Sequence, residues 1–165
     1  MIAGPNCQIV FGTESERLKD QMRLMIQSLQ KKQTFLVPIK GRVLDLEVAP
    51  DDTFSQKVLG DGFLIDPVGD TVVAPLDAEV MHLFPSLHAI ALKASDETEI
   101  LIHVGIDTVH MKGEGFKAFV KIGDQVKQGQ VLIQFDLSLI KQKAKSALTP
   151  IVFTNPDKVI QIPRT

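Results

Sequence analysis

The chain has 165 residues, 20 of them acidic and 18 basic, and its formal net charge is −2. The length suits one domain with a sizeable core, and the interspersed charges argue against a nucleic-acid-binding protein, which usually presents a basic face. No apolar run reaches the length of a membrane span and no signal peptide is apparent, so we expect no direct membrane insertion. The single cysteine, Cys7, cannot form an internal disulfide, which fits a reducing cytoplasm.

Residues 1–33 are expected to form an extension ahead of the main domain, which would occupy residues 34–165. Residues 7–12 have the pattern of a short strand that ends at a glycine. From Thr13 onward, apolar residues recur at helical spacing and predict an amphipathic helix. The polar face mixes acids and bases, which favours packing on the protein itself over binding to a membrane.

The segment after the extension has the pattern strand, turn, strand. Residues 35–43 are echoed by residues 72–80, with a proline near the strand start in both, where its missing donor is tolerated. This weak internal repeat indicates a duplicated β unit whose halves close on one core. Turn clusters lie at 60–62 and 67–70, and Asp51 begins the only helical turn expected in this half.

Two alternating segments, 86–93 and 98–103, predict a β-hairpin around a polar turn cluster at 94–97. A tight turn at the centre of this cluster would pair His88 with His103. In a regular hairpin the two imidazoles would stand opposite each other on one face, with Cβ atoms about 4.5–5.5 Å apart. This geometry favours a functional pair over two unrelated strand histidines.

Two facing histidines leave two chemistries open. Neutral imidazole is the commonest metal ligand, and a catalytic metal usually needs a third protein ligand, which Asp107 could supply. The other chemistry is phosphoryl transfer through a phosphohistidine, in which one ring attacks while the other ring and backbone donors stabilise the phosphoryl oxygens. An ordinary pKa of about 6.5 leaves enough neutral imidazole for such a reaction at pH 7.

The last third of the chain again predicts short elements. Residues 119–135 predict two strands around a glycine-bounded loop, and residues 137–146 predict a short helix. Closing strands are expected at 151–153 and 159–162. Many short strands at even spacing predict an all-β fold, an antiparallel β-sandwich or barrel with one or two short helices and the N-terminal helical extension.

The sequence around His103 resembles the signature of a known family. Residues 102–109 (Ile-His-Val-Gly-Ile-Asp-Thr-Val) and 112–116 (Lys-Gly-Glu-Gly-Phe) are similar to those of the glucose-family IIA domain of the bacterial phosphoenolpyruvate-dependent sugar phosphotransferase system. Further matching pieces lie at residues 57–62, 73–75, 134–136 and 144–150. The similarity spans about residues 35–160. It implies a β-sandwich of the duplicated hybrid motif type and a phosphocarrier that needs no cofactor.

The resemblance also implies roles for single residues. His103 would be the phosphorylated nucleophile, attacking through Nε2 while the carbonyl of Gly105 holds its Nδ1–H. His88 would contact and stabilise the phosphoryl group. Ser86 would orient His88, and Asp107 and Asp51 would flank the site. An apolar rim for docking partners would consist of Phe54, Phe84, Leu101 and Val109.

Strand alternation adds that Leu101 shares a face with His103 and should therefore lie near the active surface. The chain departs from the family pattern at three positions near the site. Pro85 stands where polar residues are commoner, and His82 and His110 replace charged residues.

The implied partners are HPr, which would donate the phosphoryl group, and a IIB domain, whose cysteine would accept it so that sugar is phosphorylated during uptake. Residues 8–12, with Leu18 and Lys19, resemble the C-terminal tail of a IIB domain, which precedes IIA in one chain in many members. Residues 27–33 would then be the linker. This arrangement implies a cytoplasmic location, at the inner face of the membrane through the IIB and IIC parts.

Other function classes compete with this interpretation. Residues 126–132 also look like a lipoyl or biotinyl carrier module, but no lysine has the exposed hairpin-tip setting of a modified lysine. A zinc peptidase on a similar duplicated fold would need a further His-x-His pair, which the sequence lacks. A regulatory partner-binding protein, whose phosphorylation is only a signal, remains a third alternative.

Overall fold

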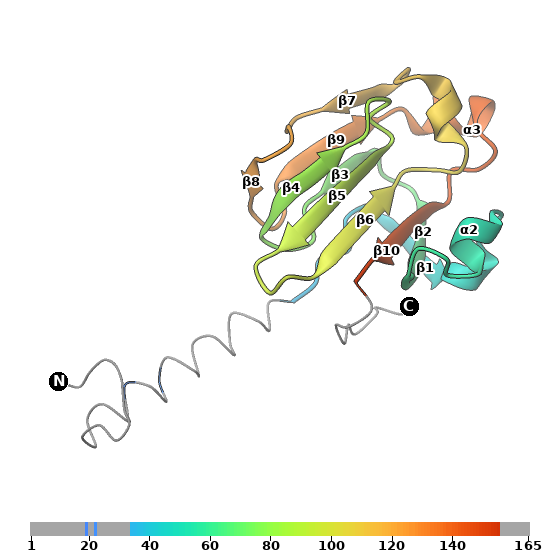
Figure 1. Ribbon diagram of the computed structural model, residues 1–165. Helices are drawn as coiled ribbons and strands as arrows, with labels where there is room; N and C mark the ends of the chain where they lie inside the picture. The colour runs from blue at the N-terminus through green and yellow to red at the C-terminus, as the bar shows by residue number, and fades with distance from the viewer. Residues whose placement is uncertain (1–18, 20–21, 23–33, 156–165) are drawn as a thin grey trace. The chain divides into compact units, whose positions relative to one another are not determined.

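The computed structural model describes residues 34–155 together with Lys19 and Met22 (Figure 1). The chain divides into two units, Met1–Thr34 and Phe35–Thr165, and the fold described below belongs to the second. The strand, helix and linker expected within residues 7–33 lie outside the described residues except for Lys19 and Met22, which are helical, and the closing strand expected at 159–162 also lies outside them. No helix in the described part of the chain is long and apolar enough to cross a membrane.

Two antiparallel sheets form the domain (Figure 1). The larger sheet has the order β1 (Gly41–Asp45), β2 (Asp61–Pro67), β10 (Thr149–Phe153), β6 (Glu99–His103), β5 (Ala89–Ala94), β4 (Ala78–Leu83) and β8 (Gln125–Val126). The smaller sheet has the order β3 (Thr71–Val73), β9 (Val131–Phe135) and β7 (Phe116–Ala118). Every pairing is antiparallel. The predicted all-β antiparallel fold is confirmed.

One apolar core lies between the sheets. Ile90 and Ile102 of the larger sheet and Val72 and Ile133 of the smaller sheet belong to it, and all four are 0% exposed. Along β6, Ile100 and Ile102 are buried while Glu99, Leu101 and His103 are half-buried. Because side chains alternate across a strand, one face of β6 fills the core and the other carries His103.

The predicted repeat is visible in the strand positions, because β1 and β4 begin at corresponding residues of it, Gly41 and Ala78. The predicted helical turn is α2 (Asp52–Ser55), which begins after Asp51 because that carboxylate accepts the Thr53 N–H at 2.8 Å. Two 3₁₀ turns that the sequence analysis did not predict lie at Leu46–Val48 (η1) and Thr108–Met111 (η2).

The predicted helix at 137–146 is shorter, since α3 spans Leu137–Lys143. Ala144 already has an extended backbone. After it, the Lys145 N–H donates to the carbonyl of Ile106 and the Ile106 N–H donates to the carbonyl of Ser146. This bridge competes with the last helical turn and ties the segment to the loop after β6.

The predicted register of the β5–β6 hairpin is wrong by one residue, because Ala89 rather than His88 pairs with His103. The turn has one more residue than expected: Glu97 has φ 74°, and the Ala94 N–H donates to the carbonyl of Thr98 at 2.8 Å. A two-residue turn requires unusual backbone angles that Gly or Asn adopts best, and the chain offers neither there.

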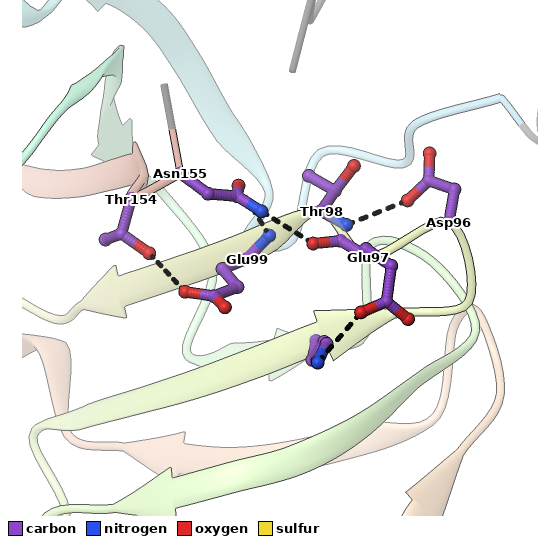
Figure 2. Close-up of polar contacts among 7 residues, drawn as sticks. Asp96, Glu97, Thr98, Glu99, Thr154 and Asn155 are labelled. Carbon is purple, nitrogen blue, oxygen red and sulfur yellow. Dashed lines mark hydrogen bonds and ion pairs between the residues drawn. The ribbon is translucent and has the colours of Figure 1, made fainter. Parts of the chain in front are cut away.

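Polar contacts fix this turn to the end of β10 (Figure 2). The Asn155 side chain donates to the carbonyl of Glu97 at 2.6 Å and accepts the Glu99 N–H at 3.0 Å. The Asp96 carboxylate accepts the Thr98 N–H at 3.0 Å, and Lys93 pairs with Glu97 at 2.9 Å. The end of the hairpin that lies away from His103 is therefore held at several points.

Core packing beside His103 predicts that two isoleucines contribute very differently to the free energy of unfolding. Ile102 is 0% exposed, so Ile102→Ala should lower the free energy of unfolding by about 2–5 kcal/mol. Ile122 is 58% exposed, so Ile122→Ala should change it by no more than about 0.5 kcal/mol. Urea unfolding measures both values, and equal losses would contradict the assignment of the core.

Candidate active site

His103 ends β6, and His88 directly precedes β5. The centroids of their rings lie 4.9 Å apart with the planes at 79°, an edge-to-face contact. The predicted proximity of the two imidazoles is thus confirmed, although the strand register that suggested it is not. The contact arises where the hairpin leaves regular strand geometry.

The ring of His103 is oriented by the backbone. Its Nδ1 lies 2.7 Å from the carbonyl oxygen of Gly105, as the resemblance implied. A carbonyl can only accept, so this contact places the proton of the neutral ring on Nδ1. The tautomer leaves the lone pair of Nε2 free for nucleophilic attack.

Gly105 is required by the shape of this loop. Its φ is +73°, and an added Cβ would lie 2.6 Å from Cγ2 of Thr108 and 3.0 Å from the carbonyl oxygen of Ser146. A larger residue would therefore move the carbonyl that holds His103, for both conformational and steric reasons.

Buried threonines hold the same loop in place. The Thr108 hydroxyl donates to the carbonyl of Val104 at 2.6 Å, and the Gly105 N–H donates to the Thr149 hydroxyl at 3.3 Å. Both threonines are 0% exposed. These roles have no signature in the sequence, because no local pattern shows that Thr149, on β10, faces the loop after β6.

His88 is only 5% exposed, and its Nδ1 is buried without a hydrogen-bond partner. A neutral ring must carry one proton, so this environment favours the proton on Nε2. Burial, and secondarily repulsion from the His103 ring, lowers the pKa of His88 to about 4. At neutral pH, His88 is therefore an uncharged ring.

Ser86 does not orient the His88 ring through Nδ1, since the described residues give this atom no hydrogen-bond partner. The backbone explains this correction. Ser86 lies inside a tight turn in which the Leu87 N–H donates to the carbonyl of Phe84 at 2.7 Å. Ser86 therefore acts on His88 as part of this backbone turn rather than through its hydroxyl.

The predicted carboxylates both act on His103. Burial is the largest effect and lowers the pKa of His103, while the hydrogen bond to Gly105 and the charges of Asp51 and Asp107 raise it in part. Asp51 caps α2, and Asp107 precedes η2 with φ 63° and no side-chain cap. The two carboxylates thus flank the His103 ring, as expected.

Aromatic rings surround the histidine pair on both sides. The ring of Phe54 lies 5.1 Å from that of His103, and the ring of Phe84 lies 5.6 Å from that of His88. His82 continues the series at 4.6 Å from Phe84. The imidazoles therefore sit in an apolar setting, which explains why burial lowers both pKa values.

The predicted docking rim is only partly exposed. Val109 is 45% exposed, and Phe84 and Leu101 are half-buried. Phe54 is 6% exposed and belongs to a second core cluster, so its placement on the rim is wrong: its buried ring packs against that of His103. This cluster consists of Leu46, Ala49, Phe54, Leu64, Ile106 and Val152, with Leu101 packed against it.

Two exposed apolar residues were not predicted as part of the docking rim. Val58 and Leu59, which follow α2, are 69% and 42% exposed. They lie next in the chain to the helix that carries Phe54. Isolated apolar residues after a helical turn give no signal in a sequence, because single exposed side chains of this kind are common.

The metal alternative lacks its third ligand. Within residues 34–155, and at the two described positions before them, no group of three or more His, Cys, Asp or Glu side chains could hold a metal ion. Asp107 therefore does not complete a site with the two histidines. The geometry suits a nucleophile with a neutral neighbour better than a resident catalytic metal.

The buried His88 ring should make stability depend on pH. Its pKa is about 4 in the folded protein and 6.5 when unperturbed, so below pH 6.5 the unfolded chain binds a proton that the folded chain does not. Stability should fall between pH 6.5 and 4, by up to about 3 kcal/mol from this ring. Urea unfolding across this interval should show a smaller loss in His88→Gln, and an identical loss in both proteins would contradict the assignment.

The role of Gly105 can be tested in the free protein. Gly105→Ala should displace the carbonyl and release the Nδ1 proton of His103, which long-range ¹H–¹⁵N correlation spectra of the ring detect as a change of tautomer. Gly113→Ala is a matched control, because Gly113 also has positive φ but an added Cβ would meet nothing closer than 3.8 Å. An unchanged His103 tautomer in Gly105→Ala would show that the carbonyl does not fix the ring.

Comparison with known proteins shows the family of the chain. Residues 33–159 match the family described as phosphoenolpyruvate-dependent sugar phosphotransferase system, EIIA 1. A glucose-specific EIIA component of Halalkalibacterium halodurans is 48% identical over 129 residues, which cover 78% of this chain and 75% of that protein.

Two further relatives extend this comparison. The glucosamine-specific EIICBA component of Bacillus subtilis is 45% identical over 168 residues, covering 91% of this chain, which spans only 27% of that longer protein. The solved structure of a glucose permease IIA from Mycoplasma capricolum has a TM-score of 0.75 and 35% identity, covering 79% of this chain and 85% of that one. The chain therefore belongs to the EIIA 1 family of the sugar phosphotransferase system, a family of phosphohistidine carriers.

Proposed function

We propose that this domain carries a phosphoryl group on Nε2 of His103, which it receives from phosphorylated HPr and passes to the cysteine of a IIB domain. The observation that carries the proposal is the 2.7 Å contact between Nδ1 of His103 and the carbonyl of Gly105, because it leaves Nε2 as the only nucleophilic nitrogen of that ring. The lowered pKa of His103 supports it, since the ring is neutral at pH 7.

The transfer balances without a cofactor. The Nε2 lone pair of His103 attacks phosphorus, an N–P bond forms, and the N–P bond to the donor imidazole breaks. In the second step, a thiolate attacks the same phosphorus, an S–P bond forms, the N–P bond to Nε2 of His103 breaks, and His103 returns to the neutral ring with its lone pair. Nδ1–H can remain bonded to Gly105 throughout, so the ring needs no reorientation between the two steps.

His88 would stabilise the transferred group. Its ring is 4.9 Å from that of His103 and neutral, and the unpartnered Nδ1 favours a proton on Nε2. An Nε2–H donor directed at a phosphoryl oxygen would stabilise charge that develops during transfer. This role requires a neutral donor of fixed orientation rather than a second nucleophile.

Asp51 and Asp107 would tune the carrier and its docking. Negative charge beside a phosphohistidine repels the phosphoryl group and favours its departure, and it complements basic residues of a partner. The exposed side chains of Val58, Leu59 and Val109 would supply apolar contact area around the histidines. Phe84 and Leu101 would contribute the parts that remain accessible.

The domain organisation is part of the same proposal, with residues 34–165 as the IIA domain and residues 1–33 as a linker that includes the tail of a IIB domain. The match to the B. subtilis EIICBA component covers 91% of this chain, whereas the family match begins at residue 33. Since only about a tenth of the chain is left uncovered, the longer match must enter residues 1–33. The domain would act in the cytoplasm, near the membrane when joined to IIB and IIC parts.

The carrier-module alternative loses its structural basis. A lipoyl- or biotinyl-type lysine sits at the tip of a β-hairpin, but the resembling segment forms β8 and β9, which lie in different sheets. The loop between them is a crossover rather than a hairpin tip. The alternative of a regulatory protein differs from a carrier only in onward transfer, which an experiment can measure.

The test is phosphorylation by phosphoenolpyruvate, enzyme I and HPr, followed by intact mass. Wild type should gain one acid-labile phosphoryl group, His103→Gln should gain none, and His88→Gln should still gain one but pass it to a IIB domain more slowly. His110→Gln, at an exposed position of η2, is the control and should behave as wild type. No mass gain in wild type while HPr is phosphorylated would refute the carrier, and stable phosphorylation without transfer would favour the regulatory role.

A further inference from the structure

The β4–β5 connection has an unusual backbone directly before His88. Leu87 has φ 60°, in the left-handed region that bulky residues rarely adopt. The resemblance to the family and the comparisons assign no role to this residue. Strained backbone conformations of this kind persist only where the surroundings impose them, and they cluster at functional sites.

The surroundings of Leu87 do impose its conformation. Leu83 pairs with Ile90 at the end of the hairpin, and the Phe84 N–H donates to the carbonyl of Ala89 at 3.1 Å. Beyond the loop, the Val104 N–H donates to the carbonyl of His88 at 2.7 Å. With both ends fixed, the four residues between Phe84 and Ala89 must reverse the chain.

A tight turn carries out the reversal. The Leu87 N–H donates to the carbonyl of Phe84 at 2.7 Å, which makes Pro85 the second and Ser86 the third residue of the turn. Proline is favoured at the second position because its ring fixes φ near the required value. Pro85 thus restricts the loop to the turn, and Leu87 then completes the reversal with a left-handed residue.

The consequence is the position of the His88 ring. Ala89 pairs with His103, so continued strand alternation would direct residue 88 to the core face with Ile90, away from His103. The ring is instead 4.9 Å from the His103 ring and 5.6 Å from the Phe84 ring. Because its Nδ1 has no hydrogen-bond partner, packing and backbone are what hold this ring in place.

We propose that Leu87 is a positioning residue for phosphoryl transfer: its left-handed backbone, together with the turn that Pro85 favours, holds the His88 imidazole beside His103. The proposal rests on the carrier function proposed above. It predicts that any residue compatible with positive φ supports transfer at this position, whereas a residue that resists positive φ does not.

The decisive comparison is Leu87→Val with Leu87→Asn. Valine is β-branched and resists the left-handed region, whereas asparagine tolerates it. Leu87→Val should slow transfer from phosphorylated His103 to the purified IIB domain of the B. subtilis glucosamine component by about ten- to a hundredfold, the scale that a misplacement of about 1 Å causes. Leu87→Asn should transfer at close to the wild-type rate.

A second measurement does not depend on the carrier function. Titration of the ring nitrogens by NMR should show the pKa of His88 rising from about 4 toward 6.5 in Leu87→Val and returning in Leu87→Asn, because a displaced ring gains water. If wild type accepts no phosphoryl group, the proposed function fails, and this titration still decides the positioning role.

Glu97→Val is the matched control. Glu97 has φ 74° in the turn at the other end of β5, so valine strains it in the same way, away from the histidines. It should lower the stability but leave the transfer rate and the His88 titration unchanged. Should Leu87→Val not fold, Leu87→Gly and Leu87→Ala replace the pair, with Gly expected to be faster. Equal transfer and equal His88 titration within the chosen pair would overturn the proposal.

Discussion

The site depends on the hydrogen bond between Nδ1 of His103 and the carbonyl of Gly105, at 2.7 Å. That bond decides which ring nitrogen keeps its lone pair, and it requires a backbone that only glycine adopts without strain, with φ +73° and no space for a Cβ. Long-range contacts secure the loop: Thr149 on β10 accepts the Gly105 N–H, and Ser146 pairs with Ile106. Ser146 and Thr149 are thus needed to orient the ring of His103, more than forty residues earlier in the chain.

The two histidines share an apolar environment but differ in what compensates for it. His103 has a carbonyl at Nδ1 and two carboxylates that partly offset the effect of burial on its pKa. His88 has no partner at Nδ1, and its pKa falls to about 4. A buried polar atom without a partner costs about 1–3 kcal/mol, a cost that the rest of the core must offset. The arrangement keeps both rings neutral at pH 7. Nε2 of His103 then carries a lone pair, whereas Nε2 of His88 carries the proton.

Local patterns in the sequence predicted the local features well. Period-two alternation placed Leu101 on the face of His103, and the helical turn after Asp51 follows from its capping carboxylate. The register failed because Glu97, neither Gly nor Asn, occupies the left-handed position that lengthens the turn. The rings still meet because a second left-handed residue, Leu87, lies at the other end of the strand. Neither a glutamate nor a leucine indicates a left-handed conformation in a sequence. At both positions the conformation is imposed by contacts with residues outside the turn.

The sequence did not predict contacts between distant segments, for the same reason. Thr149 follows β6 by more than forty residues, and only the pairing of β10 with β6 brings it to Gly105. Phe54 resembled a surface anchor but is buried beside His103, because α2 carries it into a second core cluster. Motifs in the sequence therefore singled out His88 and His103, while the residues that orient these rings required the tertiary structure.

The hairpin that carries the histidines has two very different ends. At one end, Asn155 bonds to Glu97 and Glu99 and fixes the turn (Figure 2). Phe35 packs there too, with its ring 5.7 Å from that of Phe153, which pairs with Ile100 near the start of β6. Since β6 runs five residues from Glu99 to His103, about 13 Å of strand separates this end from His103. The first and last residues of the described domain thus lie at the end of the hairpin away from the histidines, so under the proposed carrier function they leave free the face on which Nε2 of His103 would meet phosphorus.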